Sequence, residues 1–124
     1  MSNTIVWADI PVTDMDRARK FYGAVLQTEI PLMEGGSGNV ALLPMEPGDA
    51  SADLVRGKEN VPSRTGCTVY LAGGGDPQAM MDRAVAAGGQ VLRPLAHMGE
   101  MIGSIGYILD SEGNRIGVHE PPKR

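Results

Sequence analysis

The chain has 124 residues, of which 42% are hydrophobic and 21% charged, and its formal net charge is -4. These values are typical of one soluble globular domain, and the acidic balance argues against a nucleic-acid partner, because phosphate binding needs clustered Lys and Arg. No stretch approaches the roughly 20 consecutive apolar residues that span a bilayer, so we expect no membrane partner.

The first half of the chain predicts a strand, a helix and three further strands. The first strand covers residues 4–10, and a helix follows from Asp14. Thr13 is its predicted N-cap, and Asp16 completes a pattern that resembles a capping box. Apolar residues at helical spacing mark the buried face of this helix: Met15, Ala18, Phe21, Tyr22 and Val25. The later strands are predicted over residues 29–32, 40–45 and 52–56.

The second half repeats this order after a polar linker over residues 59–65. A strand near residues 67–71 precedes a helix with Asp76 as N-cap and Pro77 at its first position, and Gly88-Gly89 ends it. Its predicted buried residues are Met80, Met81, Ala84, Val85 and Ala87. Strands are predicted over residues 90–93, 105–109 and 115–119.

The two helix starts, Asp14 and Asp76, are separated by half the length of the chain. Each half therefore consists of one β-α-β-β-β module, the first about residues 1–62 and the second about residues 63–124. We predict an α+β fold: a single domain, 1–124, whose curled mixed sheets form a cup. An α/β doubly wound sheet is disfavoured, because three strands with short gaps follow each helix.

Cys67 is the single cysteine, so no intramolecular disulfide is possible. A lone thiol fits a reducing compartment, and the N-terminal residues lack the basic and apolar segments of a secretory signal. We therefore expect a cytoplasmic protein. The apolar strand around Cys67 predicts an inert, buried thiol.

Three segments resemble one known family: Ile10-Pro11-Val12-Thr13-Asp14 with Ala18 and Phe21-Tyr22 after it, Ala86-Ala87-Gly88-Gly89-Gln90-Val91, and Asp110-Ser111-Glu112-Gly113-Asn114-Arg115-Ile116. In this order they are similar to the vicinal oxygen chelate superfamily, which includes glyoxalase I and the bleomycin-resistance proteins. The Trp7-x-Asp9 start and the ending at 116–120 resemble a glyoxalase-related subgroup that is depleted in metal ligands.

This resemblance implies a cup that holds a divalent ion in the metal-using members, with ligands on the first and last strands of each module. The corresponding positions here are Trp7, residues 67–69, Val55 and Gly117. Trp, Val and Gly side chains offer no ligand atom, and one thiolate does not make a site. We therefore expect no metal and no other cofactor.

Strand alternation places three groups of residues toward the cup: Ile5, Trp7 and Asp9; Cys67, Val69 and Leu71; and Arg115, Gly117 and His119. The candidate ligand-binding residues are Trp7, Asp9, Cys67, Arg115, Gly117 and His119. Trp7 either walls a planar ligand or fills core space opposite Gly117. Asp9 either contacts a ligand or acts as a base, or it pairs with Arg115.

Two histidines are candidates for chemistry. His119 is a candidate proton carrier or a surface residue, and His97 lies in a loop over residues 95–103 that acts as a lid or as a plain connection. Together with Glu100 or Glu120, the two histidines also have the composition of a ferrous site with two histidines and one carboxylate.

The leading functional hypothesis is a metal-independent protein that binds a small organic molecule in the cup, as in bleomycin-resistance-type sequestration. The alternative is a glyoxalase-like lyase or isomerase, or a dioxygenase, with Asp9 or His119 as the catalytic acid or base. A scaffold that only mediates association is a third class. The resemblance also implies a homodimer. The ligand, the presence of catalysis, and the pairing of modules within or between chains stay open.

Overall fold

The computed structural model describes residues 3–122 as seven strands and two helices. The elements are β1 (Trp7–Pro11), α1 (Met15–Leu26), β2 (Val40–Leu42), β3 (Ser51–Val55), β4 (Val69–Ala72), α2 (Pro77–Ala86), β5 (Gln90–His97), β6 (Ser104–Leu109) and β7 (Arg115–Glu120). The outermost positions of the two predicted modules, 1–2 and 123–124, lie outside the described residues. No helix within residues 3–122 is long and apolar enough to cross a membrane.

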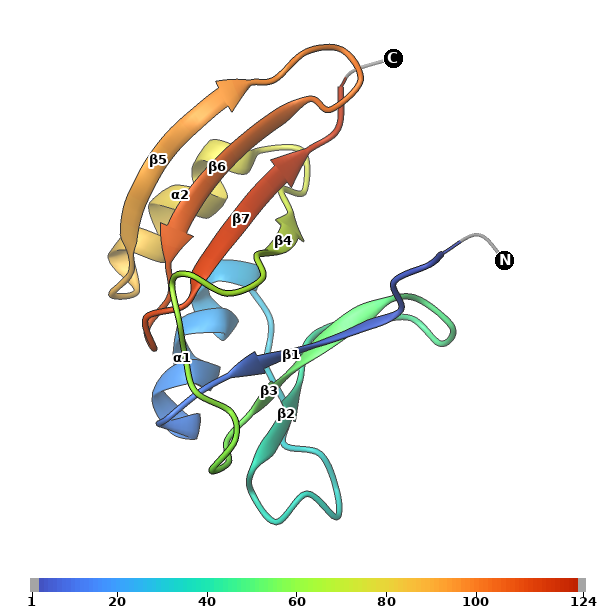
Figure 1. Ribbon diagram of the computed structural model, residues 1–124, viewed down its shortest axis with the longest axis vertical. Coiled ribbons are helices and arrows are strands. Elements are labelled where there is room, and N and C mark those ends of the chain that lie inside the picture. The colour runs from blue at the N-terminus through green and yellow to red at the C-terminus, as the bar shows by residue number, and fades with distance from the viewer. Residues whose placement is uncertain (1–2, 123–124) are drawn as a thin grey trace.

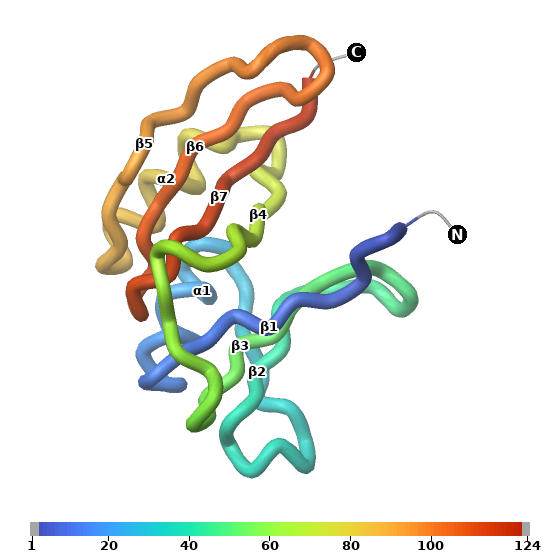
Figure 2. Tube along the Cα trace, in the orientation of Figure 1, coloured from blue at the N-terminus to red at the C-terminus, as the bar shows by residue number. Residues whose placement is uncertain are grey.

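The strands form two mixed sheets that repeat one topology. In the first sheet, of order β1-β3-β2, β1 runs parallel to β3. In the second, of order β4-β7-β6-β5, β4 runs parallel to β7. Figure 1 shows the sheets in succession, with β1 and β4 at their adjoining edges, and Figure 2 traces the linker that connects them. The predicted α+β fold is confirmed, with one helix and one mixed sheet in each module, and the sheets do not close into a barrel. The second module has the predicted β-α-β-β-β order, whereas the first has one strand fewer.

Both helices begin at an aspartate whose side chain accepts a hydrogen bond from the backbone N–H three residues later. The distance is 3.0 Å at Asp14 and 3.1 Å at Asp76, so the predicted half-chain spacing holds at the helix starts. The prediction of Thr13 as the first N-cap is wrong, because Glu112 engages both the N–H and the hydroxyl of Thr13. Pro77 opens α2 as predicted.

Several predicted strands differ in extent from those of the structure: β1 begins at Trp7 instead of residue 4, and β2 ends at Leu42 instead of residue 45. Residues 29–32 do not form a strand, and only one bridge, between Leu32 and Ala41, occurs there. β5 is longer than predicted, because its antiparallel pairing with β6 continues as far as His97 opposite Ser104. The first module is therefore a shortened copy of the second.

The core lies between the helices and the sides of the sheets that face them. The predicted buried face of α1 is confirmed at Met15, Ala18, Phe21, Tyr22 and Val25. In α2, Met80, Met81 and Ala84 are buried as predicted, but Val85 is 48% exposed and Ala87 is only partly buried. The core therefore fills one side of the sheets and leaves the opposite side, the cup face, uncovered by helices.

The turn between β6 and β7 fastens the second module to the start of α1. The side chain of Glu112 is fully covered, accepts hydrogen bonds from the N–H groups of Thr13 and Asp14 at 2.9 Å, and pairs with Arg17 at 2.7 Å. Burial raises the pKa of Glu112, but the hydrogen bonds from Arg17, Asp14 and Thr13 outweigh burial and lower this pKa to about 2. Glu112 is thus held as a carboxylate.

Two more side chains of this turn join the modules. Asp110 accepts a hydrogen bond from the buried Tyr22 hydroxyl at 2.5 Å. Asn114 donates to the backbone carbonyl of Pro11 at 2.7 Å and accepts from the N–H of Ser63 at 3.0 Å. The turn that contributes to the family resemblance therefore has a structural role: it connects β1, α1 and the linker.

Candidate functional site

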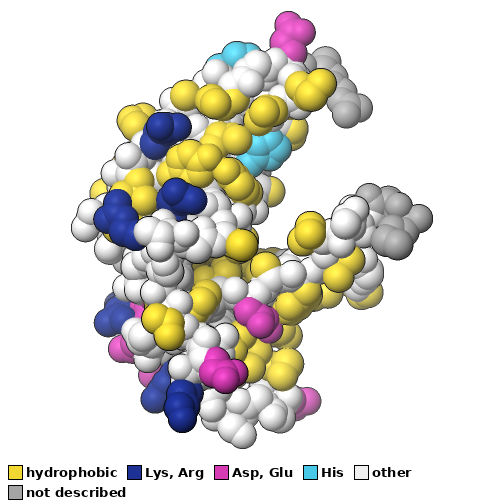
Figure 3. Space-filling view, in the orientation of Figure 1, with side chains coloured by type: hydrophobic (Ala, Val, Ile, Leu, Met, Phe, Trp, Pro, Cys, Tyr) yellow, Lys and Arg dark blue, Asp and Glu magenta, His cyan; other side chains and the backbone are white. Residues whose placement is uncertain are grey.

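The cup face of the first sheet carries an aromatic and an acidic group. Ile10 and Leu54 are buried toward the helices, so the alternation of side chains turns Trp7 and Asp9 of β1, and Asp53 of β3, toward the cup. This geometry agrees with the face predicted for Trp7 and Asp9. Figure 3 shows the molecule hollowed between its two modules, with many hydrophobic side chains along the hollow.

Strand pairing identifies the residues of the cup face that lie opposite one another. Asp9 lies opposite Asp53 in the first sheet, and Tyr70 lies opposite Gly117 in the second. Val55 lies opposite Pro11 at the end of β3.

Asp9 and Asp53 form a pair of neighbouring carboxyl groups. Asp53 is only 9% exposed, and its Oδ1 atom has no hydrogen-bond partner among the described residues. Burial and the adjacent Asp9 carboxyl raise the pKa of Asp53 to about 6, although the Trp7 indole lowers this pKa in part. The predicted alternative of an Asp9–Arg115 pair is wrong, because the Arg115 guanidinium donates to Thr68 Oγ1 at 2.7 Å instead.

Trp7 is 39% exposed and therefore does not fill the core in this chain. The two residues before it, Ile5 and Val6, are 75% and 61% exposed, so an uncovered apolar stretch leads into β1. Exposed apolar side chains in succession indicate a surface for a ligand or a partner.

The cup face of the second sheet carries two tyrosines. The Tyr70 ring lies across Gly117, where an added Cβ atom would collide with the ring. Gly117 therefore does not leave the gap opposite Trp7 that the sequence predicts, because Tyr70 covers it. The hydroxyls of Tyr70 and Tyr107 lie 2.7 Å apart, and the Arg115 guanidinium lies 5.7 Å from the centre of the Tyr107 ring.

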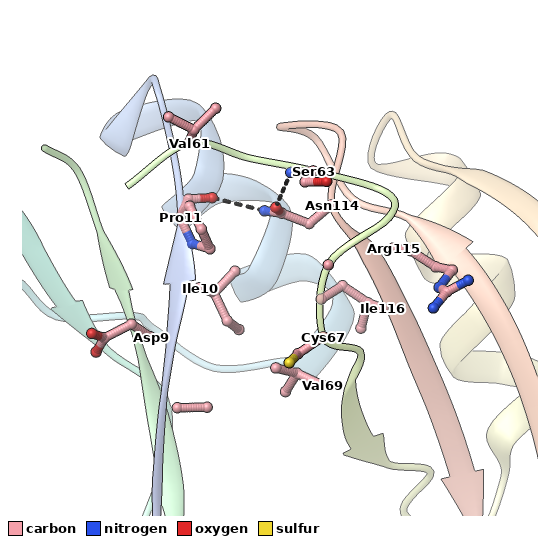
Figure 4. Close-up of a pocket in the computed structure, with 12 residues that line it drawn as sticks. Asp9, Ile10, Pro11, Val61, Ser63, Cys67, Val69, Asn114, Arg115 and Ile116 are labelled. Atoms are coloured by element: carbon pink, nitrogen blue, oxygen red, sulfur yellow. Dashed lines mark hydrogen bonds between the residues drawn. The ribbon is translucent and has the colours of Figure 1, made fainter. Parts of the chain in front are cut away.

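A cavity of about 350 Å³ lies in the seam between β1 and the linker before β4. Apolar side chains form much of its wall: Ile10, Val61, Val69 and Ile116. Asp9, Cys67 and Arg115 also line it, but the close-up in Figure 4 shows the Asp9 carboxylate and the Arg115 guanidinium pointing away from its centre. Trp7, Gly117 and His119 do not line this cavity. The six candidate residues are thus divided between the seam and the cup face.

The face predicted for the first strand of the second module is wrong. Val69 and Leu71 lie opposite Ile116 and Val118 on the side that packs against the helices. The alternation therefore turns Tyr70 toward the cup. Cys67 precedes β4 and is exposed, so it is not the buried thiol that its apolar neighbours predict.

The two histidines lie in different surroundings. His119 is partly buried, and its Nε2 atom lies 2.7 Å from the carbonyl oxygen of Ile102. Because a carbonyl only accepts, Nε2 carries the hydrogen, and Nδ1 of the neutral ring keeps a lone pair. His97 ends β5, so the loop predicted over residues 95–103 is shortened to residues 98–103.

The donor set does not fit the divalent ion of the metal-using members. Within residues 3–122, no group of three or more His, Cys, Asp or Glu side chains is placed to hold a metal ion. His97, Glu100 and Glu120 border an open depression of about 1030 Å³, but His119 is absent from it. The hypothesis of a ferrous site with two histidines and one carboxylate is therefore wrong.

Three residues of the cup face escaped prediction from the sequence. Asp53 lies between apolar Ala52 and Leu54, which is the same pattern that singled out Asp9. Tyr70 and Tyr107 come into contact because both lie opposite Gly117, in the pairings of β4 and β6 with β7. No sequence pattern predicts this register.

A protein-family model described as the Glyoxalase/Bleomycin resistance protein/Dioxygenase superfamily matches residues 4–118. No curated protein matches the chain.

Solved structures share the fold at low sequence identity. A glyoxalase/bleomycin resistance protein from Albidiferax ferrireducens is 17% identical, with a TM-score of 0.78, over 97% of this chain and 100% of its own. A glyoxalase-related enzyme from Fulvimarina pelagi is 16% identical, with a TM-score of 0.70, over 97% of this chain and 88% of its own. A glyoxalase/bleomycin resistance protein/dioxygenase family enzyme from Burkholderia phytofirmans is 13% identical, with a TM-score of 0.67, over 92% of this chain and 95% of its own. These likenesses establish the fold and no activity.

Proposed function

Because the chain belongs to the glyoxalase/bleomycin resistance protein/dioxygenase superfamily, we propose that it binds a small organic molecule in its cup without a metal ion. The observation that carries this proposal is the aromatic lining of the cup face. Trp7 is 39% exposed on the first sheet and Tyr70 is 46% exposed on the second, where its hydroxyl meets that of Tyr107. Aromatic walls with a few polar groups are typical of small-molecule sites.

The charged side chains on the cup face would orient a bound ligand. The first sheet offers the carboxyl groups of Asp9 and Asp53, and the second offers the guanidinium of Arg115 beside Tyr107. Opposite charges at separate places orient a ligand that has both polar and apolar parts. The carboxyl pair lacks the third donor that a divalent ion would need, which is why the proposal excludes a metal.

A thermal-shift screen of metabolites and antibiotics, in buffer with a chelator, tests the proposal. A true ligand at a hundredfold excess over its Kd stabilises the fold by about 2.7 kcal/mol. Trp7→Ala and Tyr70→Ala are expected to weaken this stabilisation, whereas Met101→Ala, at a 94% exposed loop residue, retains it. A screen that finds no ligand would contradict binding in the cup. So would ligands whose stabilising effect is the same in Trp7→Ala and Tyr70→Ala as in the wild type.

The second candidate function is a glyoxalase-like lyase or isomerase. The pKa of Asp53, raised to about 6 by burial and by Asp9, favours it, because a carboxyl that titrates near neutrality exchanges protons efficiently. Asp53, with Asp9 beside it, or the Nδ1 atom of His119 would then serve as the acid or base. Turnover of a screened hit that falls in Asp53→Asn, Asp9→Asn or His119→Ala supports this function, and a hit recovered unchanged from long incubation rejects it.

The proposal also includes the cellular location and the assembly. A lone, exposed Cys67 fits a reducing cytoplasm. The apolar stretch before β1 needs cover, which a second copy of the chain would supply in a homodimer.

A further inference from the structure

The cavity in the seam between the modules is separate from the cup face. It has a volume of about 350 Å³, and residues of β1, the linker, β4 and β7 line it. Ile10 and Ile116 are fully buried at its floor, whereas Val61 and Cys67 are exposed at its rim. Figure 4 shows the Ile10 side chain on one side of this space and the Cys67 sulfur on the other. Cavities of about 300–1,000 Å³ are typical of small-molecule sites, so the seam cavity has the size for a ligand.

The amide and hydroxyl side chains of the cavity wall already bond within the chain. Asn114 donates to the backbone carbonyl of Pro11 at 2.7 Å and accepts from the N–H of Ser63 at 3.0 Å, so both ends of its amide are engaged. The Ser63 hydroxyl lies 3.0 Å from the hydroxyl of Thr65. These side chains therefore leave a ligand mainly the apolar part of the wall.

The charged side chains of the wall turn away from the cavity. Figure 4 shows the Asp9 carboxylate and the Arg115 guanidinium directed away from its centre. The Arg115 guanidinium donates to Thr68 Oγ1 at 2.7 Å and lies 5.7 Å from the centre of the Tyr107 ring. An ion in the cavity would lose its water without gaining a partner, which is costly. The wall therefore favours a neutral molecule.

The backbone of β1 offers this molecule one place to form hydrogen bonds. The N–H of Val12 donates to the carbonyl of Val55 in β3 at 2.9 Å. Because the backbone groups of successive residues point to opposite edges of a strand, those of Pro11 and Asp9 face the seam. The Pro11 carbonyl is bonded to Asn114, and proline has no N–H, so the N–H and carbonyl of Asp9 are left. β1 is an edge strand, and an unpaired edge accepts a donor and an acceptor from a ligand.

We propose that the seam cavity binds a small, neutral aromatic carboxamide. Its ring packs against the apolar side chains of Ile10, Val69 and Ile116, and its amide pairs with the backbone of Asp9. The space is sufficient, since a cavity of about 150 Å³ already holds benzene. A ligand here contacts both modules and stabilises their junction. This second site goes beyond the proposed function of the cup.

Alkylation of Cys67 by iodoacetamide tests the inference, because this single cysteine lines the cavity and is exposed. Benzamide, benzoate and benzamidine have nearly the same shape and are neutral, anionic and cationic. At a tenfold excess over its Kd, benzamide is expected to slow alkylation about tenfold, in proportion to the bound fraction. Benzoate and benzamidine at the same concentration are expected to leave the rate unchanged. Alkylation of glutathione in the same solutions controls for effects on the reagent.

Two variants locate the bound benzamide. Ala8→Leu enlarges a partly buried side chain of the cavity wall and is expected to remove most of the protection of Cys67. Ala96→Leu, at an exposed position of β5, is the matched control and is expected to retain it. Trp7→Ala is also expected to retain it, because Trp7 does not line the cavity. The comparison of the three probes uses the wild type and does not depend on the folding of a variant.

The outcomes separate this inference from the proposed function. Equal protection of Cys67 by the three probes, or protection by none of them, overturns the inference. So does benzamide protection that Ala8→Leu retains in full. Protection that is lost in Trp7→Ala would place benzamide in the cup, which overturns the inference and supports the proposed function. Benzamide protection that follows the expected pattern, together with a cup screen that finds no ligand, rejects the proposed function and leaves the inference standing.

Discussion

At the residue scale, Asp9 and Asp53 show what a strand pattern reveals and what it omits. An aspartate between apolar neighbours singled out Asp9 in the sequence, and Asp53 has the same pattern. Their meeting depends on the register of two strands that lie far apart in the chain. Register is set by the packing of whole elements, so a single sequence identifies the residue but not its neighbour.

The raised pKa of Asp53 predicts a pH-dependent stability. Burial and Asp9 raise the pKa to about 6 in the folded protein, from 3.8, so the folded state binds the proton more tightly than the unfolded state. Stability from this group is then complete below about pH 4 and is lost as the pH rises through about 6, by about 1–3 kcal/mol. Asp53→Asn has no titrating carboxyl at this position and therefore does not lose this stability. Urea denaturation is expected to show that the free energy of unfolding of the variant, relative to that of the wild type, increases between pH 4 and 7.

The control for this prediction is Asp49→Asn, which changes an exposed turn residue. Its stability is expected to follow the wild type at every pH. Parallel profiles for the wild type and Asp53→Asn would show that the carboxyl of Asp53 titrates as it does in the unfolded chain.

At the scale of elements, the β6–β7 turn decides how the modules are joined. The helix starts were predictable to within one residue, because capping is local chemistry. The shift from Thr13 to Asp14 as N-cap has its cause 99 residues away in sequence, at Glu112. The reduction of residues 29–32 to a single bridge likewise follows from sheet pairing, which local propensity does not determine.

Glu112→Gln is expected to destabilise the fold by about 1–3 kcal/mol at pH 7, because charged hydrogen bonds to Thr13, Asp14 and Arg17 are weakened. The pKa of Glu112, lowered from 4.5 to about 2, means that its contribution is present above about pH 4.5 and fades as the pH falls toward 2. Denaturation curves at several pH values measure both effects. Asp16→Asn, whose carboxylate is 97% exposed on the same helix, is the control and is expected to be neutral.

Gly117→Ala tests the packing of the tyrosine pair. The added Cβ atom would collide with Tyr70 Cδ1, so the ring must move and its hydroxyl separates from that of Tyr107. We expect a loss of about 1–3 kcal/mol, as for other overpacked sites. Gly66→Ala is the control, since nothing lies within 4 Å of an added Cβ atom there. Equal stability of the two variants in urea would contradict the placement of Tyr70.

At the scale of the whole molecule, the repeat was the most predictable feature. Two helix starts separated by half the chain, each between strands, were sufficient to predict the two modules. The cup face was less predictable, because a one-residue shift of β4 exchanges Leu71 for Tyr70 on that face. Fold therefore follows from patterns that tolerate such shifts, whereas a site depends on which of two adjacent side chains points inward.

The open shape of the molecule predicts a homodimer. Ile5 and Val6 are 75% and 61% exposed, and β1 pairs on one edge only, so this region needs a partner surface. Sedimentation equilibrium at micromolar concentration is expected to give twice the 13.1 kDa chain mass. Val6→Asp is expected to shift the protein toward monomer, whereas Met101→Asp, in the 98–103 turn, is not. A wild-type protein of 13.1 kDa only would contradict the dimer.

A cup that binds an organic molecule without a metal is the central claim, and one calorimetric comparison tests it most directly. A hit from the thermal-shift screen is titrated into protein purified with a chelator, and into the same protein supplemented with Zn²⁺, Mn²⁺ or Fe²⁺. We predict one ligand per chain with the same Kd in every case, since the aromatic and acidic side chains of the cup face make all the contacts. Binding that appears only after a metal is added would contradict the claim.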